Sequence, residues 1–149
     1  MTDLIEKLKT PEDCETFAQN ASERGRPDLA LAARKRAVSL RAAQYGAQSD
    51  IERECIEAVY AYEEVLSQKN GKKTRASRTW PMIKKHGIIT AVERAVNREV
   101  ETQGYTALVE MGLEDYAFEA VILRHPKAFS AEVVERSRLR VAAHQSQNS

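Results

Sequence analysis

The sequence holds little proline, glycine and cysteine for its length of 149 residues. The 4 prolines and 6 glycines stand singly, and 42% of the residues are hydrophobic, which argues against a disordered chain. The 2 cysteines, Cys14 and Cys55, are too few for a secreted disulfide framework, and each lies on an apolar stripe with helical spacing. We therefore expect two reduced thiols in the protein core.

Long apolar runs are also missing. No stretch approaches the roughly 18 residues that a membrane-spanning helix needs. The segment from Met1 to Lys9 carries Asp3 and Glu6 and has no apolar core of the kind found in signal peptides. We therefore expect a cytoplasmic protein that does not use a membrane as a partner.

Known catalytic motifs are absent as well. The sequence has no phosphate-binding loop, no dinucleotide-binding glycine motif and no serine-hydrolase elbow, and its histidines lack metal-ligand spacing. One acidic cluster comprises Glu110, Glu114, Asp115 and Glu119. Metal-dependent nucleases use clustered carboxylates, but acids are also expected at the helix start predicted here. We predict no catalytic residue, no metal site and no cofactor, and an enzyme is the least favoured class.

The hydrophobic pattern predicts an all-α fold, in one compact multi-helix domain spanning residues 1–149. Residues 10–68 are expected to form an antiparallel helical hairpin and a third helix. Thr10 caps the first helix, which Gly25 ends, and the second runs from Pro27 to about Tyr45. Ser49 and Glu52 form a capping box for the third helix.

The pattern also predicts a helical half over residues 80–143. The expected helices are a short one ending at Gly87, a second over Ile88–Arg98, a weaker one over Tyr105–Met111, a central buried one over Leu113–Arg124, and a last one from Ser130 to about Ala143. Residues 144–149 are polar and predict a frayed tail.

Charge is unevenly distributed, although the net charge is only +1. Residues 69–98 hold nine lysines and arginines and a single acid, Glu93, for a balance of +8. The segments before and after them have balances of −4 and −3. We call residues 69–98 the basic segment. Within it, residues 69–79 contain almost no apolar side chain and predict a basic loop.

Such a segment is typical of contact with a nucleic-acid backbone, because Lys and Arg neutralise phosphates and Ser and backbone N–H groups hydrogen-bond to them. A helix starting after the loop would add its N-terminus. Trp80 either stacks on a base or packs in the core, a choice that the sequence leaves open. The candidate DNA- or RNA-binding residues are Lys69, Lys72, Lys73, Arg75, Ser77, Arg78, Trp80, Lys84, Lys85, Arg94 and Arg98.

The stretch from Trp80 to Arg98 resembles a helix-turn-helix, since a glycine lies in the turn and Arg94 and Arg98 share a helical face. It departs from that motif in its short first helix and in the apolar pair Ile88-Ile89 after the turn. A plain corner between two core helices is the favoured interpretation.

A second function class stays open. The N-terminal hairpin would then provide a groove for another protein, and the basic loop would contact an acidic protein surface. An exposed apolar groove between Thr10 and Tyr62 would favour this class. A smaller basic patch, comprising Arg34, Lys35, Arg36 and Arg41, is expected to be a solvated helix face, or an extension of the basic loop if the two lie side by side.

Overall fold

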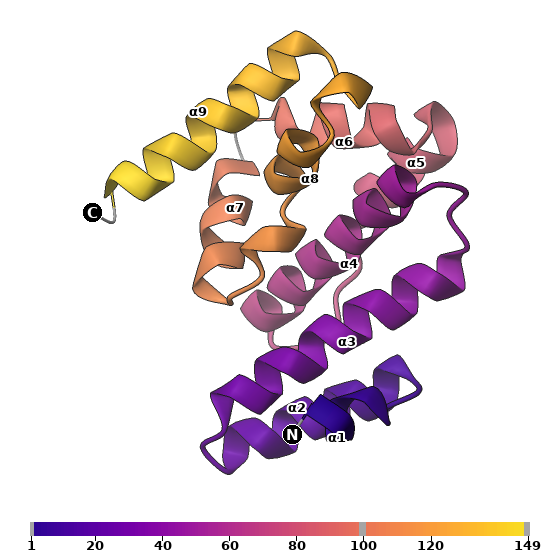
Figure 1. Cartoon of the computed structure of the whole chain (residues 1–149), viewed down its shortest axis with the longest axis vertical. Coiled ribbons are helices and arrows are strands. Elements are labelled where there is room, and N and C mark those ends of the chain that lie inside the picture. Colours follow the sequence, from indigo (N-terminus) through magenta and orange to yellow (C-terminus); the bar gives the residue numbers. More distant parts are fainter. Residues whose placement is uncertain (1, 99–100, 148–149) are drawn as a thin grey trace. The chain divides into compact units, whose positions relative to one another are not determined.

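The computed structural model describes residues 2–98 and 101–147. Within these ranges the chain forms α-helices and short 3₁₀ helices and has no strand, which confirms the all-α prediction (Figure 1). The contacts between residues divide the chain into two compact units, Met1–Ala47 and Gln48–Ser149. That all the helices form one domain stays a prediction, and the two units are described separately.

The first unit contains α1 (Thr2–Glu6), α2 (Pro11–Glu23) and α3 (Pro27–Tyr45). The Thr10 hydroxyl accepts a hydrogen bond from the backbone N–H of Asp13, as the predicted cap requires. Helices α2 and α3 pack along one another, consistent with the predicted hairpin. Their interface is lined by small side chains, so the two backbones come close; its buried residues include Ala18, Ala21, Ala30 and Ala33.

The second unit is built around α4 (Asp50–Asn70), which contacts α6, α7 and α8. Its start has the predicted Ser49 cap, which is one half of the predicted capping box. The Ser49 hydroxyl accepts from the backbone N–H of Glu52 at 3.2 Å and lies 3.4 Å from the Glu52 carboxylate. Helix α4 ends at Gly71, whose φ of 69° is the left-handed conformation that glycine adopts without strain.

The rest of this unit comprises α5 (Thr79–His86), α6 (Ile88–Val96), α7 (Glu101–Glu110), η1 (Glu114–Tyr116), α8 (Phe118–Arg124), η2 (Pro126–Ala128) and α9 (Ala131–Gln147). The prediction of one helix over Leu113–Arg124 is wrong. Ala117 has an extended backbone, which separates the 3₁₀ turn η1 from α8. Periodicity missed the break because apolar residues continue across it, and Ala117 itself is buried.

Several other boundaries also differ from the predicted ones. Helix α6 ends at Val96 rather than at Arg98, and α7 runs over Glu101–Glu110 rather than Tyr105–Met111. Lys69 belongs to α4 and Thr79 to α5, so the loop is shorter than residues 69–79 at both ends. Helix α9 continues to Gln147, and the predicted end at Ala143 is therefore too early. Of the predicted frayed tail, residues 148 and 149 lie outside the described part of the chain.

Candidate nucleic-acid interface

The basic loop, Gly71–Arg78, is tied to the last turns of α4. The Ser67 hydroxyl accepts from the backbone N–H of Thr74 at 2.8 Å. The Asn70 amide donates to the Thr74 hydroxyl at 3.2 Å, and that hydroxyl donates to the backbone carbonyl of Lys72 at 2.9 Å. Thr74 is therefore held from both sides, and these bonds tie the exposed polar loop to the end of α4.

A buried carboxylate on α4 anchors the second half of the loop. Glu63 Oε2 accepts hydrogen bonds from Arg75 Nε at 2.9 Å, from the backbone N–H of Ala76 at 2.8 Å and from Trp80 Nε1 at 2.6 Å. Ala76, the only apolar residue in the loop, is itself buried. Glu63 gives no signal in the sequence, because it lies on a helix among other acids and no spacing marks it as the partner of a distant loop.

Trp80 is half-buried at the first turn of α5. Its ring lies 5.2 Å from the ring of Tyr60, and the Arg75 guanidinium lies 5.3 Å from its centroid, within the range of a cation–π contact. The indole N–H of Trp80 and part of its ring have partners within the protein. Trp80 therefore packs the loop against α4.

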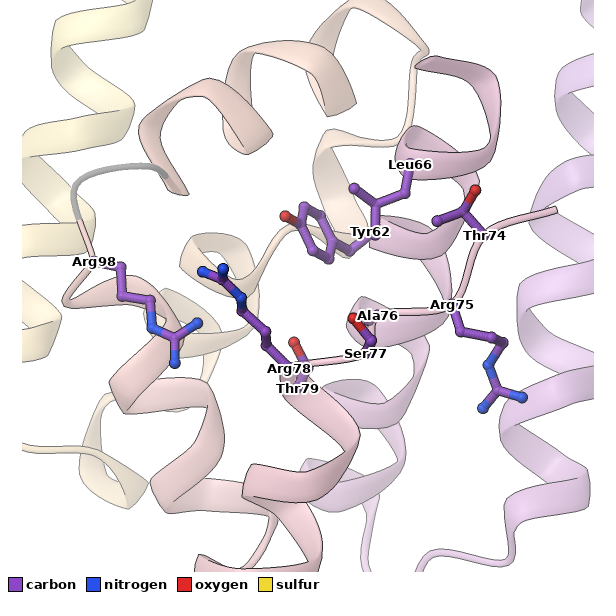
Figure 2. Close-up of a pocket in the computed structure, with 9 residues that line it drawn as sticks. All are labelled: Tyr62, Leu66, Thr74, Arg75, Ala76, Ser77, Arg78, Thr79 and Arg98. Carbon is purple, nitrogen blue, oxygen red and sulfur yellow. The ribbon is translucent and has the colours of Figure 1, made fainter. Parts of the chain in front are cut away.

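Beside the loop lies a pocket of about 260 Å³ (Figure 2). Its lining residues come from α4, the loop, the start of α5 and the end of the basic segment; they are Tyr62, Leu66, Thr74, Arg75, Ala76, Ser77, Arg78, Thr79 and Arg98. Figure 2 shows the side chains of Arg78 and Arg98 extending toward one another, whereas the side chain of Arg75 points away from both. The fold thus brings together two candidate arginines that are distant in sequence.

The charge of this pocket is positive as far as the described residues show. They bring three arginines and no acid to its lining, and among them Glu63 pairs with Arg75. Within the described residues, the Arg78 side chain has no hydrogen bond or ion pair, and the Arg98 side chain makes one hydrogen bond, to the Met82 sulfur at 3.3 Å. The single acid of the basic segment is also occupied, because Glu93 accepts from the backbone N–H of Ser130 at 2.7 Å.

The N-terminus of α5 adds little to this site, contrary to the expectation from sequence. The backbone N–H groups of Thr79 and Trp80 both donate to the carbonyl of Ala76, and Pro81 has no N–H. Most of the donors that normally make a helix N-terminus an anion site are thus occupied or absent. An anion in the pocket would depend on side chains.

The remaining candidate residues are exposed: Lys69, Lys72, Lys73, Ser77, Lys84, Lys85 and Arg94. Around the turn between α5 and α6, partial burial lowers the pKa of His86, and the nearby charges of Arg94 and Lys85 lower it further. Arg94 and Lys85 thus lie close enough to His86 to act on its imidazole.

Helices α5 and α6 form a tight corner rather than a helix-turn-helix. Only Gly87 separates them, with φ of 88°, whereas the DNA-binding motif has a turn of about three or four residues. Helix α6 buries Ala91, Val92, Ala95 and Val96 against the rest of the unit. This packing favours the plain corner, and leaves Arg94 as the exposed cation of α6.

The acidic cluster and the two cysteines, the other residues considered for chemistry, have structural roles. Within the acidic cluster, Glu119 is buried and paired with Arg140 at 2.7 Å. Cys14 and Cys55 are free and buried, as predicted, and desolvation raises the pKa of the Cys55 thiol to about 12. Such a thiol is a poor nucleophile at neutral pH. Among the described residues, no group of three His, Cys, Asp or Glu side chains could hold a metal ion.

The smaller basic patch lies on α3 of the first unit. There Arg36 donates to the backbone carbonyl of Leu8 at 3.2 Å, and Arg41 pairs with Glu15. Two of its four cations therefore have structural partners within that unit.

No protein-family model matches the chain, and searches of the curated proteins and of the solved structures give no significant match. Across the described residues, no helix combines the length and the apolar character needed to cross a membrane.

Proposed function

We propose that the protein is a nucleic-acid-binding helical module that contacts DNA or RNA through the basic segment, chiefly through phosphates. The observation that carries this proposal is the pocket to which the described residues bring three arginines and no acid, most of its lining coming from that segment. Exposed Lys72 and Lys73 lie on the same loop and would extend the contact along a phosphate backbone.

The ordered loop supports the proposal on energetic grounds. Its backbone is held by Ser67, Asn70 and Glu63, so little conformational entropy is lost when a ligand binds. Arg75 keeps a side chain that is 61% exposed despite its ion pair with Glu63, so its remaining N–H groups stay accessible to a ligand. Helix α6 buries one face against the rest of the unit, which does not suit a helix that enters the major groove to contact bases. We therefore expect contact with the nucleic-acid backbone.

The test is binding of duplex and single-stranded DNA and RNA by the full chain at two salt concentrations. Contact with roughly five phosphates should give a log–log salt slope of about −4 to −5 on duplex DNA and a shallower slope on single strands. Lys72→Glu combined with Lys73→Glu should nearly abolish binding without unfolding the protein, because both side chains are exposed.

The matched control is Lys7→Glu combined with Lys9→Glu, which changes the net charge equally at two exposed lysines outside the basic segment. This control should bind far better than the loop variant. Absence of binding by the wild type at low salt would refute the proposal, and so would an equal loss in both double variants. An acidic protein surface would then be the partner to look for.

A further inference from the structure

We infer that the Arg78–Arg98 pocket binds the terminal phosphate monoester of a nucleic-acid strand, in preference to an internal phosphodiester. This inference rests on the proposed function and gives it a specific ligand group. It begins from the two arginines, which come from either end of the α5–α6 corner and extend into one pocket (Figure 2).

The charge of the pocket matches a dianion better than a monoanion. A phosphate monoester carries about −1.5 to −2 charges at neutral pH and three terminal oxygens. An internal phosphodiester carries one charge and has two free oxygens. Arg78 and Arg98 together supply two charges, and within the described residues neither has a carboxylate partner. Guanidinium groups suit the geometry, because each can donate two parallel hydrogen bonds to a phosphate.

The walls of the pocket supply neutral contacts of the right kind. Ser77 and Thr79 bring side-chain hydroxyls to the lining, and Tyr62 and Leu66 bring an aromatic ring and an aliphatic side chain from α4. The aromatic and aliphatic groups suit the sugar next to a phosphate, whereas the hydroxyls suit its oxygens.

The size of the pocket also favours a strand end. Its volume of about 260 Å³ is slightly below the roughly 300 to 1,000 Å³ of pockets for drug-sized ligands. One phosphate with its sugar fits such a space.

The experiment compares three single-stranded oligonucleotides of one sequence that carry a 5′-phosphate, a 3′-phosphate or only hydroxyl ends. Binding to the full chain is followed by fluorescence anisotropy at low and moderate salt. We expect about tenfold tighter binding of at least one phosphorylated oligonucleotide, since each charge-assisted hydrogen bond to the extra charge adds to the affinity.

Two variants and one control locate the effect. Arg98→Gln and Arg78→Gln should each remove most of the preference for a phosphorylated end. Lys72→Gln removes the same charge from an exposed side chain that does not line the pocket. It should weaken binding of all three oligonucleotides by the same factor and keep the preference. Melting temperature and the fluorescence of Trp80, the only tryptophan, check that each variant is folded.

The outcomes separate this inference from the proposed function. Equal affinity for phosphorylated and hydroxyl ends overturns the inference and leaves the nucleic-acid proposal standing. No binding of any oligonucleotide at low salt overturns both. A phosphoserine peptide and inorganic phosphate serve as further probes, and binding of either without binding of oligonucleotides would assign the pocket to another phosphate source and overturn the inference.

Discussion

The carboxylate of Glu63 on α4 accepts the indole N–H of Trp80 on α5 at 2.6 Å, across seventeen residues of sequence. The same oxygen binds Arg75 and the backbone N–H of Ala76. One buried acid thus sets the path of the basic loop and neutralises Arg75, and Arg78 is left to extend into the pocket beside Arg98 (Figure 2). The positive charge of the site therefore depends on Glu63 pairing with Arg75 and not with Arg78.

Replacing Glu63 by alanine should destabilise the protein by about 1 to 3 kcal/mol, because the backbone N–H of the buried Ala76 and the Trp80 indole N–H lose their acceptor. Urea unfolding followed by Trp80 fluorescence measures this loss directly, since the chain has one tryptophan. Glu63→Gln should cost less, because its amide oxygen still accepts.

The control for Glu63→Ala is Gln68→Ala, a truncation on the same helix at an exposed position. It should change the free energy of unfolding by no more than about 0.5 kcal/mol. Equal stability of the Glu63→Ala and Gln68→Ala variants would show that Glu63 does not anchor the loop.

Glu54 makes the stability of the second unit sensitive to acid. Burial acts to raise the pKa of this carboxyl, but hydrogen bonds from His125 and Arg124 outweigh burial and lower it. A folded-state pKa below the unfolded value of about 4.3 stabilises the fold above that pH, and the stabilisation is lost as the pH falls through the folded-state pKa. Glu54→Gln should therefore destabilise the protein at pH 6 and make little difference at the lowest pH.

Urea unfolding of both proteins between pH 6 and pH 3 provides the measurement. Glu110→Gln, at an exposed position on α7, is the control and should have little effect at any pH in this range. A difference between wild type and Glu54→Gln that stays constant with pH would contradict the assignment.

Much of the fold was predictable because local signals carry it. Thr10 and Ser49 are caps that hydrogen-bond within three residues, and Gly71 ends a helix by its own backbone conformation. The break at Ala117 was not predictable, since the surrounding apolar residues pack on either side of an extended residue as well as they would in one helix. Periodicity reports which side chains are buried and does not report a single change of backbone angle.

The candidate site was predictable in its charge but not in its geometry. Composition alone located the basic segment, because lysine and arginine counts need no knowledge of contacts. The separate roles of Arg75 and Arg78 depend on Glu63, whose effect acts between elements that are distant in sequence. In the sequence Arg75 and Arg78 look equivalent, and only the contact with Glu63 distinguishes them.

Glu119 and Arg140 form a buried ion pair that ties α8 to α9, and Arg140 also donates to the backbone carbonyl of Val96 at 3.0 Å. Arg140→Met should cost about 3 to 5 kcal/mol, because it leaves the Glu119 charge buried without a partner. The double variant Glu119→Leu with Arg140→Met should recover most of that loss, since no charge then remains buried. Urea unfolding of the two single variants and the double variant provides a double-mutant cycle, and additive effects would contradict the pairing.

Ser137 on α9 supplies the last prediction, in which removing a polar group stabilises the fold. Its side chain is fully buried, and within the described residues its hydroxyl has no hydrogen-bond partner. Ser137→Ala should therefore raise the free energy of unfolding by about 0.5 to 2 kcal/mol, because the desolvated hydroxyl is removed and alanine is the better helix former. The same substitution at Ser130 should act in the opposite direction and cost about 1 kcal/mol, since that hydroxyl accepts the N–H of Val133 at the start of the same helix. Thermal and urea unfolding of the two variants measure one chemical change at two places on one helix. A destabilised Ser137→Ala variant would mean that the buried hydroxyl is hydrogen-bonded in solution.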